Sequence, residues 1–458
     1  METKLKTLST IPKLPGWPWV GVLPQFYWQQ WDFLLAAHRT YGDIFRMDLG
    51  KTELVILAHP DYAHHVLVDN GQNYRTKGGA VGFRVSSIPL AGDGVTTTAQ
   101  PEDWRRQRRA VQPFFHKHYL TQLAPAMGDV IAEQLTQWDE LATTAQPLDL
   151  AAEMQRIAMC AVVKMVYGVP IEAEAALKLA HAIEAALDYL WQGTINECLP
   201  TWSPKPGLAR CQKAIQQVNG MVDQLIEQAL QASADEGNLI KRLRKQDPEL
   251  TPKQLREEGV TMLVGATESL PAMLGWLFHL LLQHPQTMAT LQDELAMQSE
   301  GTTQPVPAAS LPALPFARMV VQETLRLYSP VYWLQRMATE ADEIGAFQIP
   351  AGTIVVVLSH LIHHHPVIWP EPHVFRPDRF SEQAIAERHK AAWIPFGAGH
   401  RVCAALEHSL LIGQLVLSQV LQRYDLMALP NRKTSVTIGT STRPHGGVWA
   451  RLQKRNSQ

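Results

Sequence analysis

The sequence predicts a mostly α-helical protein with a small β region, an α+β fold in which helices dominate. Residues 102–300 carry an almost continuous helical periodicity of apolar side chains, interrupted only by short stretches rich in proline and glycine. Strand-like runs are concentrated in residues 42–60 and in the segment that follows residue 330. We therefore expect a helical body with a smaller sheet beside it.

The first predicted element is a β-hairpin over residues 42–60, GDIFRMDLGKTELVILAHP. Two short apolar runs rich in β-formers flank a Gly-Lys pair, which is typical of two strands joined by a tight turn.

The longest predicted element is a helix over residues 251–284. Thr251 is its expected N-cap, Pro252 takes the first helical position, and Gln254 completes a capping box. At a rise of 1.5 Å per residue this helix is roughly 45 to 50 Å long, enough to cross the molecule. Its most apolar stretch, 272–282, is about half the length that a bilayer requires, so we expect a buried helix and not a membrane span.

The last part of the chain combines short strands with irregular structure. We expect strands within 332–338 and 346–359, and a proline-rich stretch with little periodicity over 366–395. The glycine-rich turn of FGAGHRVCAALEHSL, 396–410, then places Cys403 just before a final long helix.

Composition limits the class of protein. A chain of 458 residues favours two domains on length alone, and a formal charge of −2 argues against general nucleic-acid binding. The N-terminus carries charge and proline but no long apolar run, which predicts no membrane anchor. Four cysteines in so long a chain argue against a disulfide scaffold and for a reducing cytoplasm.

Cys403 admits three interpretations. A free cysteine is most often an inert buried residue. The glycines before it and the helix after it favour a thiolate, which could act as a nucleophile with His400 or His408 as its base. A zinc ligand would need partners such as the histidines of SHLIHHHP, 359–366.

The segment FGAGHRVCAA resembles the cysteine-ligand loop of the cytochrome P450 haem-thiolate monooxygenases, Phe-x-x-Gly-x-Arg-x-Cys-x-Gly. Phe396, Gly399, Arg401 and Cys403 match this pattern, and Ala405 replaces the last glycine. The resemblance implies that Cys403 is the axial ligand of the haem iron.

A second matching motif is QETLRLYSP, which supplies Glu323 and Arg326 at helical spacing i, i+3. FRPDRF supplies Arg379, matching the family's Pro-x-Arg-Phe. The resemblance implies that the three residues form a buried structural network that fixes the cysteine-side loop, and that they are not catalysts.

A third match is the helix DWRRQRRAVQPFFHKH, which resembles the family's Trp-x-x-x-Arg helix through Trp104 and Arg108. The family implies that this pair contacts a haem propionate, together with Arg401 and Arg336. Arginine suits this role because its fork binds a carboxylate with two hydrogen bonds. Arg105, Arg109, Gln112 and His116 lie on the neighbouring face, which could dock an acidic electron-transfer partner. The alternative for so basic a run is a nucleic-acid patch.

The long helix carries the fourth match, GATESLP, aligned with the family's Ala-Gly-x-Glu-Thr-Thr. Gly265 and Ala266 would face the haem, and Glu268 and Ser269 would be the acid-alcohol pair that delivers protons for dioxygen cleavage. Pro271 lacks the N–H that the Thr267 carbonyl would accept, which predicts a bend at 267–271 beside the iron.

The resemblance covers nearly the whole chain and implies one cytochrome P450 domain over 1–458, in place of two. Residues 1–100 would hold the small sheet and a substrate-access loop, and 101–458 the helical body with the haem-binding loop at 396–405. The expected cofactor is haem b, with NAD(P)H electrons relayed by a separate ferredoxin or flavodoxin and its reductase. We expect a cytoplasmic monomer with no nucleic-acid partner.

The expected reaction is insertion of one oxygen atom from O2 into an apolar organic substrate, as in secondary metabolism. Alternatives on the same fold are an isomerase, a coupling enzyme or a peroxide user, and a different class is a non-catalytic haem sensor. The segments 80–98, 185–203 and 439–442 are expected to line the substrate pocket, as are the single residues Thr261, Met262, Val331 and Tyr332.

Overall fold

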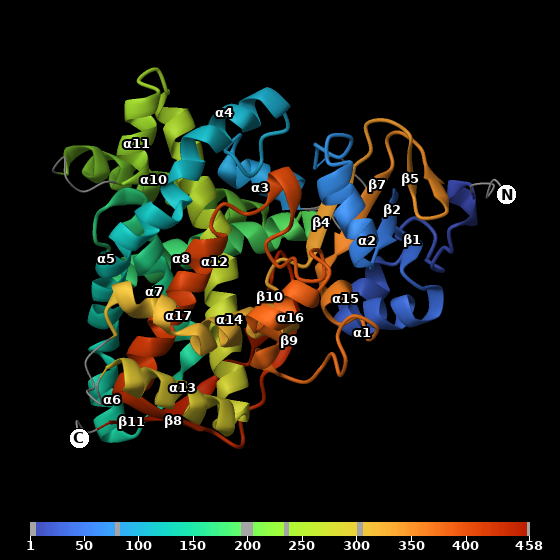
Figure 1. Ribbon diagram of the computed structural model, residues 1–458. Coiled ribbons are helices and arrows are strands. Elements are labelled where there is room, and N and C mark those ends of the chain that lie inside the picture. The colour runs from blue at the N-terminus through green and yellow to red at the C-terminus, as the bar shows by residue number, and fades with distance from the viewer. Residues whose placement is uncertain (1–5, 78–82, 194–204, 233–237, 300–305, 456–458) are drawn as a thin grey trace.

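A computed structural model describes residues 6–77, 83–193, 205–232, 238–299 and 306–455. Figure 1 shows a large helical body on one side and a smaller region with most of the β-structure on the other. The predicted fold class, mostly α with a small β region, is confirmed.

Within the described residues the strands form four small sheets. The largest has the order β1-β2-β7-β4, a second has the order β3-β11-β8, and β5 with β6 and β9 with β10 form two-stranded sheets. The strand bounds are β1 Ile44–Leu49, β2 Thr52–Leu57, β3 Pro147–Asp149, β4 Trp333–Met337, β5 Asp342–Ile344, β6 Phe347–Ile349, β7 Ile354–Leu358, β8 Tyr424–Ala428, β9 Ser435–Ile438, β10 Thr442–His445 and β11 Trp449–Lys454.

The predicted hairpin over 42–60 is confirmed as the antiparallel pair β1 and β2. Strand β2 then pairs in parallel with β7, and β4 pairs with the other edge of β7. The sheet therefore joins the first sixty residues to residues 333–358.

The helices make up most of the remaining structure. Their bounds are α1 Leu23–Tyr41, α2 Pro60–His64, α3 Phe83–Ala91, α4 Pro101–Val111, α5 Lys117–Leu135, α6 Trp138–Thr144, α7 Leu150–Tyr167, α8 Ala173–Trp191, α10 Leu208–Gln231, α11 Leu239–Gln246, α12 Pro252–Gln283, α13 Pro285–Gln298, α14 Pro315–Leu327, α15 Ser359–His363, α16 Glu382–Glu387 and α17 Leu406–Arg423. A π-helix, η2, covers His65–Asp69, and short 3-10 helices include η3 Gln112–Phe115, η5 Pro377–Phe380 and η6 Gly399–Arg401.

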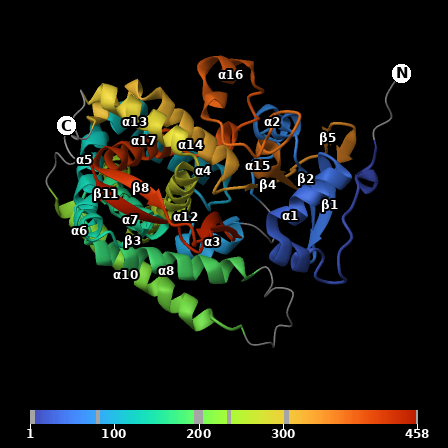
Figure 2. The same ribbon diagram turned by 90° about the horizontal axis from the view of Figure 1, so that it is seen from below.

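Helix α12 is the predicted long helix, and its N-terminus is built as expected. The Thr251 side chain accepts from the Gln254 N–H, and the Gln254 side chain accepts from the Thr251 N–H, which completes the capping box. Figure 2 shows α12 in the middle of the helical body, with other helices around it. Among the described helices it is the one long and apolar enough to span a membrane, but most of that stretch is buried within the protein.

Helical structure continues through Pro271 without interruption. The bend angle that we predicted for 267–271 stays a prediction, but the missing proline N–H does not break the helix. The neighbouring helices and apolar contacts of the core hold both halves of α12 in one continuous element.

Candidate active site

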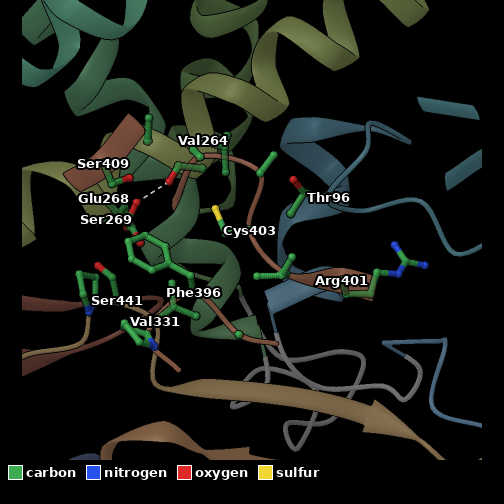
Figure 3. Close-up of a pocket in the computed structure, with 18 of the residues that line it drawn as sticks. Thr96, Val264, Glu268, Ser269, Val331, Phe396, Arg401, Cys403, Ser409 and Ser441 are labelled. Carbon is green, nitrogen blue, oxygen red and sulfur yellow. Dashed lines mark hydrogen bonds between the residues drawn. The ribbon is translucent and has the colours of Figure 1, made fainter. Parts of the chain in front are cut away.

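A cavity of about 330 Å3 lies between α12 and the loop that carries Cys403 (Figure 3). The residues that the sequence analysis named singly as lying near haem or substrate all line this cavity. These residues are Trp104, Arg108, Thr261, Met262, Gly265, Ala266, Glu268, Ser269, Val331, Tyr332, Arg336, Phe396, Arg401 and Cys403. They come from α4, α12, the segment around β4 and the cysteine loop, so the fold gathers four distant parts of the chain.

The Cys403 loop is shaped by a glycine that cannot be replaced without strain. Gly399 has a φ of 69°, and a Cβ at this position would overlap the carbonyl oxygen of Leu67 in η2. The Cys403 N–H donates to the Phe396 carbonyl oxygen at 2.9 Å, which closes the loop. Figure 3 shows the Cys403 sulfur pointing into the cavity.

The environment of the Cys403 thiol opposes its ionisation in the absence of an iron ion. Its side chain is accessible because it faces the cavity, but the surrounding protein removes it from bulk water. This burial raises the pKa of the Cys403 thiol, and the Ala405 N–H, Arg108 and Lys77 only partly counteract that effect. The thiolate character that the sequence suggested for Cys403 stays a prediction.

Positive charge collects along one part of the cavity wall. Lys77, Arg108, Arg336 and Arg401 line the cavity, whereas Glu268 is the one carboxylate among its described lining residues. Arg336 is buried, and among the described residues its guanidinium donates to the Gln335 carbonyl oxygen and forms no ion pair. Burial lowers the pKa of Arg336 to about 10. The Arg401 guanidinium lies 4.1 Å from the centre of the Trp104 ring.

These features fit haem. Its two propionates would bring negative charge to the wall that Arg108, Arg336 and Arg401 line. A thiol on one wall offers the soft ligand that haem iron accepts. On the opposite wall Gly265 leaves open space, because a Cβ added there would meet no atom within 4 Å.

The α12 wall carries the predicted acid and alcohol. Figure 3 shows Glu268 and Ser269 near each other beside the cavity. The Ser269 hydroxyl donates to the Gly265 carbonyl oxygen at 2.6 Å. Glu268 is 5% exposed, its Oε2 accepts from the Thr440 hydroxyl, and its Oε1 has no partner among the described residues. Burial raises the pKa of the Glu268 carboxyl, which favours the neutral acid.

Glu323, Arg326 and Arg379 meet away from the cavity, as the sequence predicted. Glu323 receives two hydrogen bonds of 2.7 Å from the Arg326 guanidinium, and the Arg379 Nε lies 3.5 Å from Glu323 Oε1. Arg326 also donates to the carbonyl oxygens of His363, Pro372 and Val374, and the Arg376 N–H donates to Glu323. The network thus joins α14 to the proline-rich segment that leads to the cysteine loop.

The nucleophile and zinc interpretations of Cys403 find no support in the described residues. No hydrogen bond joins its sulfur to His400 or His408, and burial lowers the pKa of His408 to about 4, which makes it a poor base at neutral pH. The histidines of SHLIHHHP point elsewhere. His363 Nε2 accepts from the Ile394 N–H, and His364 Nδ1 contacts the His360 carbonyl oxygen.

His365 belongs to a different cluster, in which His38, Asp43 and His365 lie close enough to share an ion. Both imidazoles place Nε2 against Asp43 Oδ1, at 2.7 and 3.1 Å. His365 Nδ1 accepts from the Val367 N–H, so Nε2 carries its proton and donates to Asp43. This arrangement is complete as a hydrogen-bonded cluster without a metal.

Other lining residues were only partly predictable. Thr440 and Ser441 fall within the predicted segment 439–442, and Val95 and Thr96 within 80–98. Parts of two predicted segments, 80–82 and 194–203, lie outside the described residues. Lys77, Trp191 and Gln335 line the cavity, although no motif in the sequence singled out Lys77 or Gln335.

The comparisons with known proteins agree with this geometry. The chain matches the Cytochrome P450 family over residues 12–446. It is 27% identical over 413 residues to cyclooctat-9-en-7-ol 5-monooxygenase of Streptomyces melanosporofaciens, with 88% of this chain and 86% of that protein covered. It is 25% identical over 405 residues to pentalenene oxygenase of Streptomyces avermitilis, with 87% and 86% covered.

A solved structure, the crystal structure of the cytochrome P450DA heme domain, shares the fold. It covers 99% of this chain and 98% of its own, with a TM-score of 0.86 at 22% sequence identity. The family match and the monooxygenases among the relatives define an enzyme of the haem-binding monooxygenase class. The chain belongs to the cytochrome P450 family.

Proposed function

We propose that the protein inserts one oxygen atom from O2 into an apolar organic substrate, with NAD(P)H electrons delivered by separate proteins. The observation that carries this proposal is that one cavity is lined by Cys403, by Ser269 and by Glu268, which is buried. When bound, haem b would supply the binding and reductive activation of dioxygen. Cys403 would hold its iron, and Trp104, Arg108, Arg336 and Arg401 would hold its propionates.

Glu268 and Ser269 would move protons into the cavity. Burial raises the pKa of Glu268, which favours the neutral acid that can donate a proton and take it back from solvent. The Ser269 hydroxyl, held by the Gly265 carbonyl, would pass that proton across the wall of α12. Glu323, Arg326 and Arg379 would act as scaffold, since they lie outside the cavity lining.

An apolar substrate suits the remaining wall. Met262, Val331 and Tyr332 line the cavity with many other apolar side chains. The names of the two relatives describe an alkenol and pentalenene as substrates, which supports a mostly apolar compound with a carbon-carbon double bond for this chain. A screen of such compounds by the spin-state shift of the haem would identify the ligand.

The electron donor would be a ferredoxin or flavodoxin with its reductase. Arg109, Gln112 and His116 are exposed at the end of α4, in η3 and directly after η3, on the neighbouring face from Trp104. Arg105 contacts Glu102 there, so its charge is partly offset. We propose that this face docks an acidic partner, and that the enzyme works as a monomer in the cytoplasm.

The test replaces Glu268 by glutamine, with Glu257→Gln on the same helix as the control. Glu257 does not line the cavity and lies near Lys253. We expect Glu268→Gln to slow product formation by about 10²-fold, in the range of a lost general acid. Product formation that matched the wild type would refute the proposed role of Glu268.

The same assay separates the alternatives. An isomerase or a peroxide user would form product without consuming NAD(P)H, and a haem sensor would form none. The acid and alcohol at the cavity favour oxygen activation over a sensor, which needs neither group.

A further inference from the structure

The loop 92–98 joins α3 to α4 and forms part of the wall of the cavity at Cys403. Val95 and Thr96 line this cavity, and Figure 3 shows Thr96 beside it. On the other side of the same cavity lies the Cys403 loop. The place that the loop 92–98 takes against α12 therefore sets how much room a bound substrate has.

Glycines let the backbone of this loop lie directly against α12. A Cβ added to Gly94 would overlap the Thr261 hydroxyl. A Cβ added to Gly92, whose φ is 59°, would overlap the Glu257 side chain. No side chain fits between loop and helix at these two positions, so the backbone of the loop comes within hydrogen-bonding reach of side chains on α12.

Glu258 of α12 makes such a hydrogen bond. Its Oε2 accepts from the Val95 N–H at 3.2 Å, and its Oε1 has no partner among the described residues. The side chain is 4% exposed and does not line the cavity, so it holds the wall from behind. A buried N–H that loses its acceptor is costly, which makes Glu258 an anchor of the loop.

We propose that Glu258 is a positioning residue of the substrate cavity. Its carboxyl holds the Val95 N–H and thereby fixes how closely Val95 and Thr96 approach a bound apolar substrate. The proposal rests on the proposed function in one respect, that the substrate binds in the cavity at Cys403. Glu258 itself does not contact the substrate, because it lies behind the wall.

The surroundings of Glu258 make this anchor sensitive to protonation. Burial raises the pKa of the Glu258 carboxyl to about 7, although the Val95 N–H opposes that rise. Among the charged neighbours, Glu257 raises the pKa and Arg106 of α4 lowers it. Two further acids stand on the adjoining elements, namely Asp103, which pairs with Arg106, and Asp93 in the loop.

Protonation of Glu258 favours the wall in its observed position. A wall that stays in place keeps the carboxyl buried, whereas a wall that moves away exposes the carboxyl to water and returns its pKa to the ordinary lower range. The observed position is therefore stabilised most at low pH and loses that stabilisation as the pH rises through about 7. A ligand that needs this wall should bind more weakly above that pH.

The test measures ligand binding to the holoenzyme by difference absorption spectroscopy and requires no turnover. Clotrimazole binds haem iron through its imidazole and extends aromatic rings into the cavity, whereas imidazole alone reports on the iron position. Glu258→Leu removes the acceptor of the Val95 N–H. The matched control is Glu294→Leu, because Glu294 is also buried and accepts from the N–H groups of Phe316 and Ala317, but does not line the cavity.

We expect Glu258→Leu to weaken clotrimazole binding by about tenfold at pH 6 and to leave imidazole binding unchanged, because the unpaired Val95 N–H shifts the wall. Glu294→Leu should bind both ligands as the wild type does. Glu258→Gln keeps an acceptor and is neutral at every pH. It should match the wild type at pH 6 and bind clotrimazole about threefold or more tightly than the wild type at pH 8.5. Comparison at equal pH cancels the titration of the azole itself.

Wild-type affinity for clotrimazole in Glu258→Leu, or an equal loss in Glu294→Leu, would refute the positioning role. A ratio of wild-type to Glu258→Gln affinity that stays constant from pH 6 to pH 8.5 would also overturn it, since a merely structural carboxyl gives no such pH profile. Product formed per NAD(P)H tests the proposed function separately. The expected clotrimazole results without any product would support the role of Glu258 and refute the proposed reaction.

Discussion

Two buried glutamates on neighbouring helices, Glu323 and Glu268, have very different hydrogen-bond partners. Glu323 lies behind the cysteine loop, and Glu268 lies opposite the cysteine. Glu323 is fully buried, and both of its carboxyl oxygens accept hydrogen bonds from Arg326. Glu268 is nearly as buried, but one of its oxygens has no partner among the described residues. Both oxygens of the Glu323 carboxylate are hydrogen-bonded, whereas the Glu268 carboxyl at the cavity is held by fewer partners and can change its protonation state.

The difference has an energetic meaning. A buried ion pair with complete hydrogen bonding is strongly fixed in place, because removal of either partner leaves an uncompensated charge. A buried carboxyl with few partners is held in its neutral form and can exchange a proton. The Cys403 loop lies between these regions. The Glu323 network holds the loop in place, and Glu268 can exchange a proton on the cavity side.

The largest expected effect comes from Cys403→Ser, which removes the thiol from the loop that lies between the two regions. We expect complete loss of the thiolate-type absorption band of the reduced carbon monoxide complex. Cys160→Ser is the matched control, since Cys160 is buried in α7 and does not line the cavity. Survival of the band in Cys403→Ser would mean that this loop does not hold the iron.

Glu323→Gln tests the scaffold side. We expect the free energy of unfolding to fall by about 3 to 5 kcal/mol, because Arg326 is left without its buried counter-charge. Denaturant unfolding followed by circular dichroism measures the change. The control, Arg318→Leu, breaks the exposed ion pair with Glu407 and should lower the free energy of unfolding by no more than about 1 kcal/mol. Equal costs for the two variants would remove the distinction between scaffold and surface charge.

Gly399→Ala and Gly397→Ala sharpen the comparison at the loop itself. Both glycines have positive φ, but a Cβ on Gly399 would overlap the Leu67 carbonyl oxygen, whereas one on Gly397 would meet only Leu334 at 3.8 Å. We expect the strained backbone conformation to lower the free energy of unfolding by about 1 to 3 kcal/mol in each variant. The overlap with Leu67 should lower it further in Gly399→Ala. Thermal unfolding of the two proteins should rank Gly399→Ala as the less stable, and the reverse order would contradict the loop geometry.

The smallest expected effect comes from Ser269→Thr on the cavity side. Threonine keeps the hydroxyl and adds a β-branch that restricts χ1. We expect product formed per NAD(P)H to rise and peroxide to fall, because the hydroxyl is held more firmly against Gly265. An unchanged ratio of product to NAD(P)H would show that serine already delivers protons without loss.

Much of this site was predictable because its motifs are local. The capping box at Thr251, the hairpin over 42–60 and the pair Glu323 and Arg326 depend on residues close in sequence, and all are confirmed. The pKa of the Cys403 thiol was not predictable in this way. Its pKa depends on how deeply the surrounding protein buries the thiol, which a short motif does not encode.

The sequence by itself determined the helical body, the long central helix and the motif residues at the cavity, since each follows from periodicity, turn residues or a motif of a few positions. Only the tertiary structure decided what lies on each side of Glu268. Thr440, Arg443 and Glu184 approach that region from segments more than eighty residues away along the chain. Pro271 lines a second cavity together with residues of α7, α8 and β10, which only the packing of distant segments brings to that face of α12.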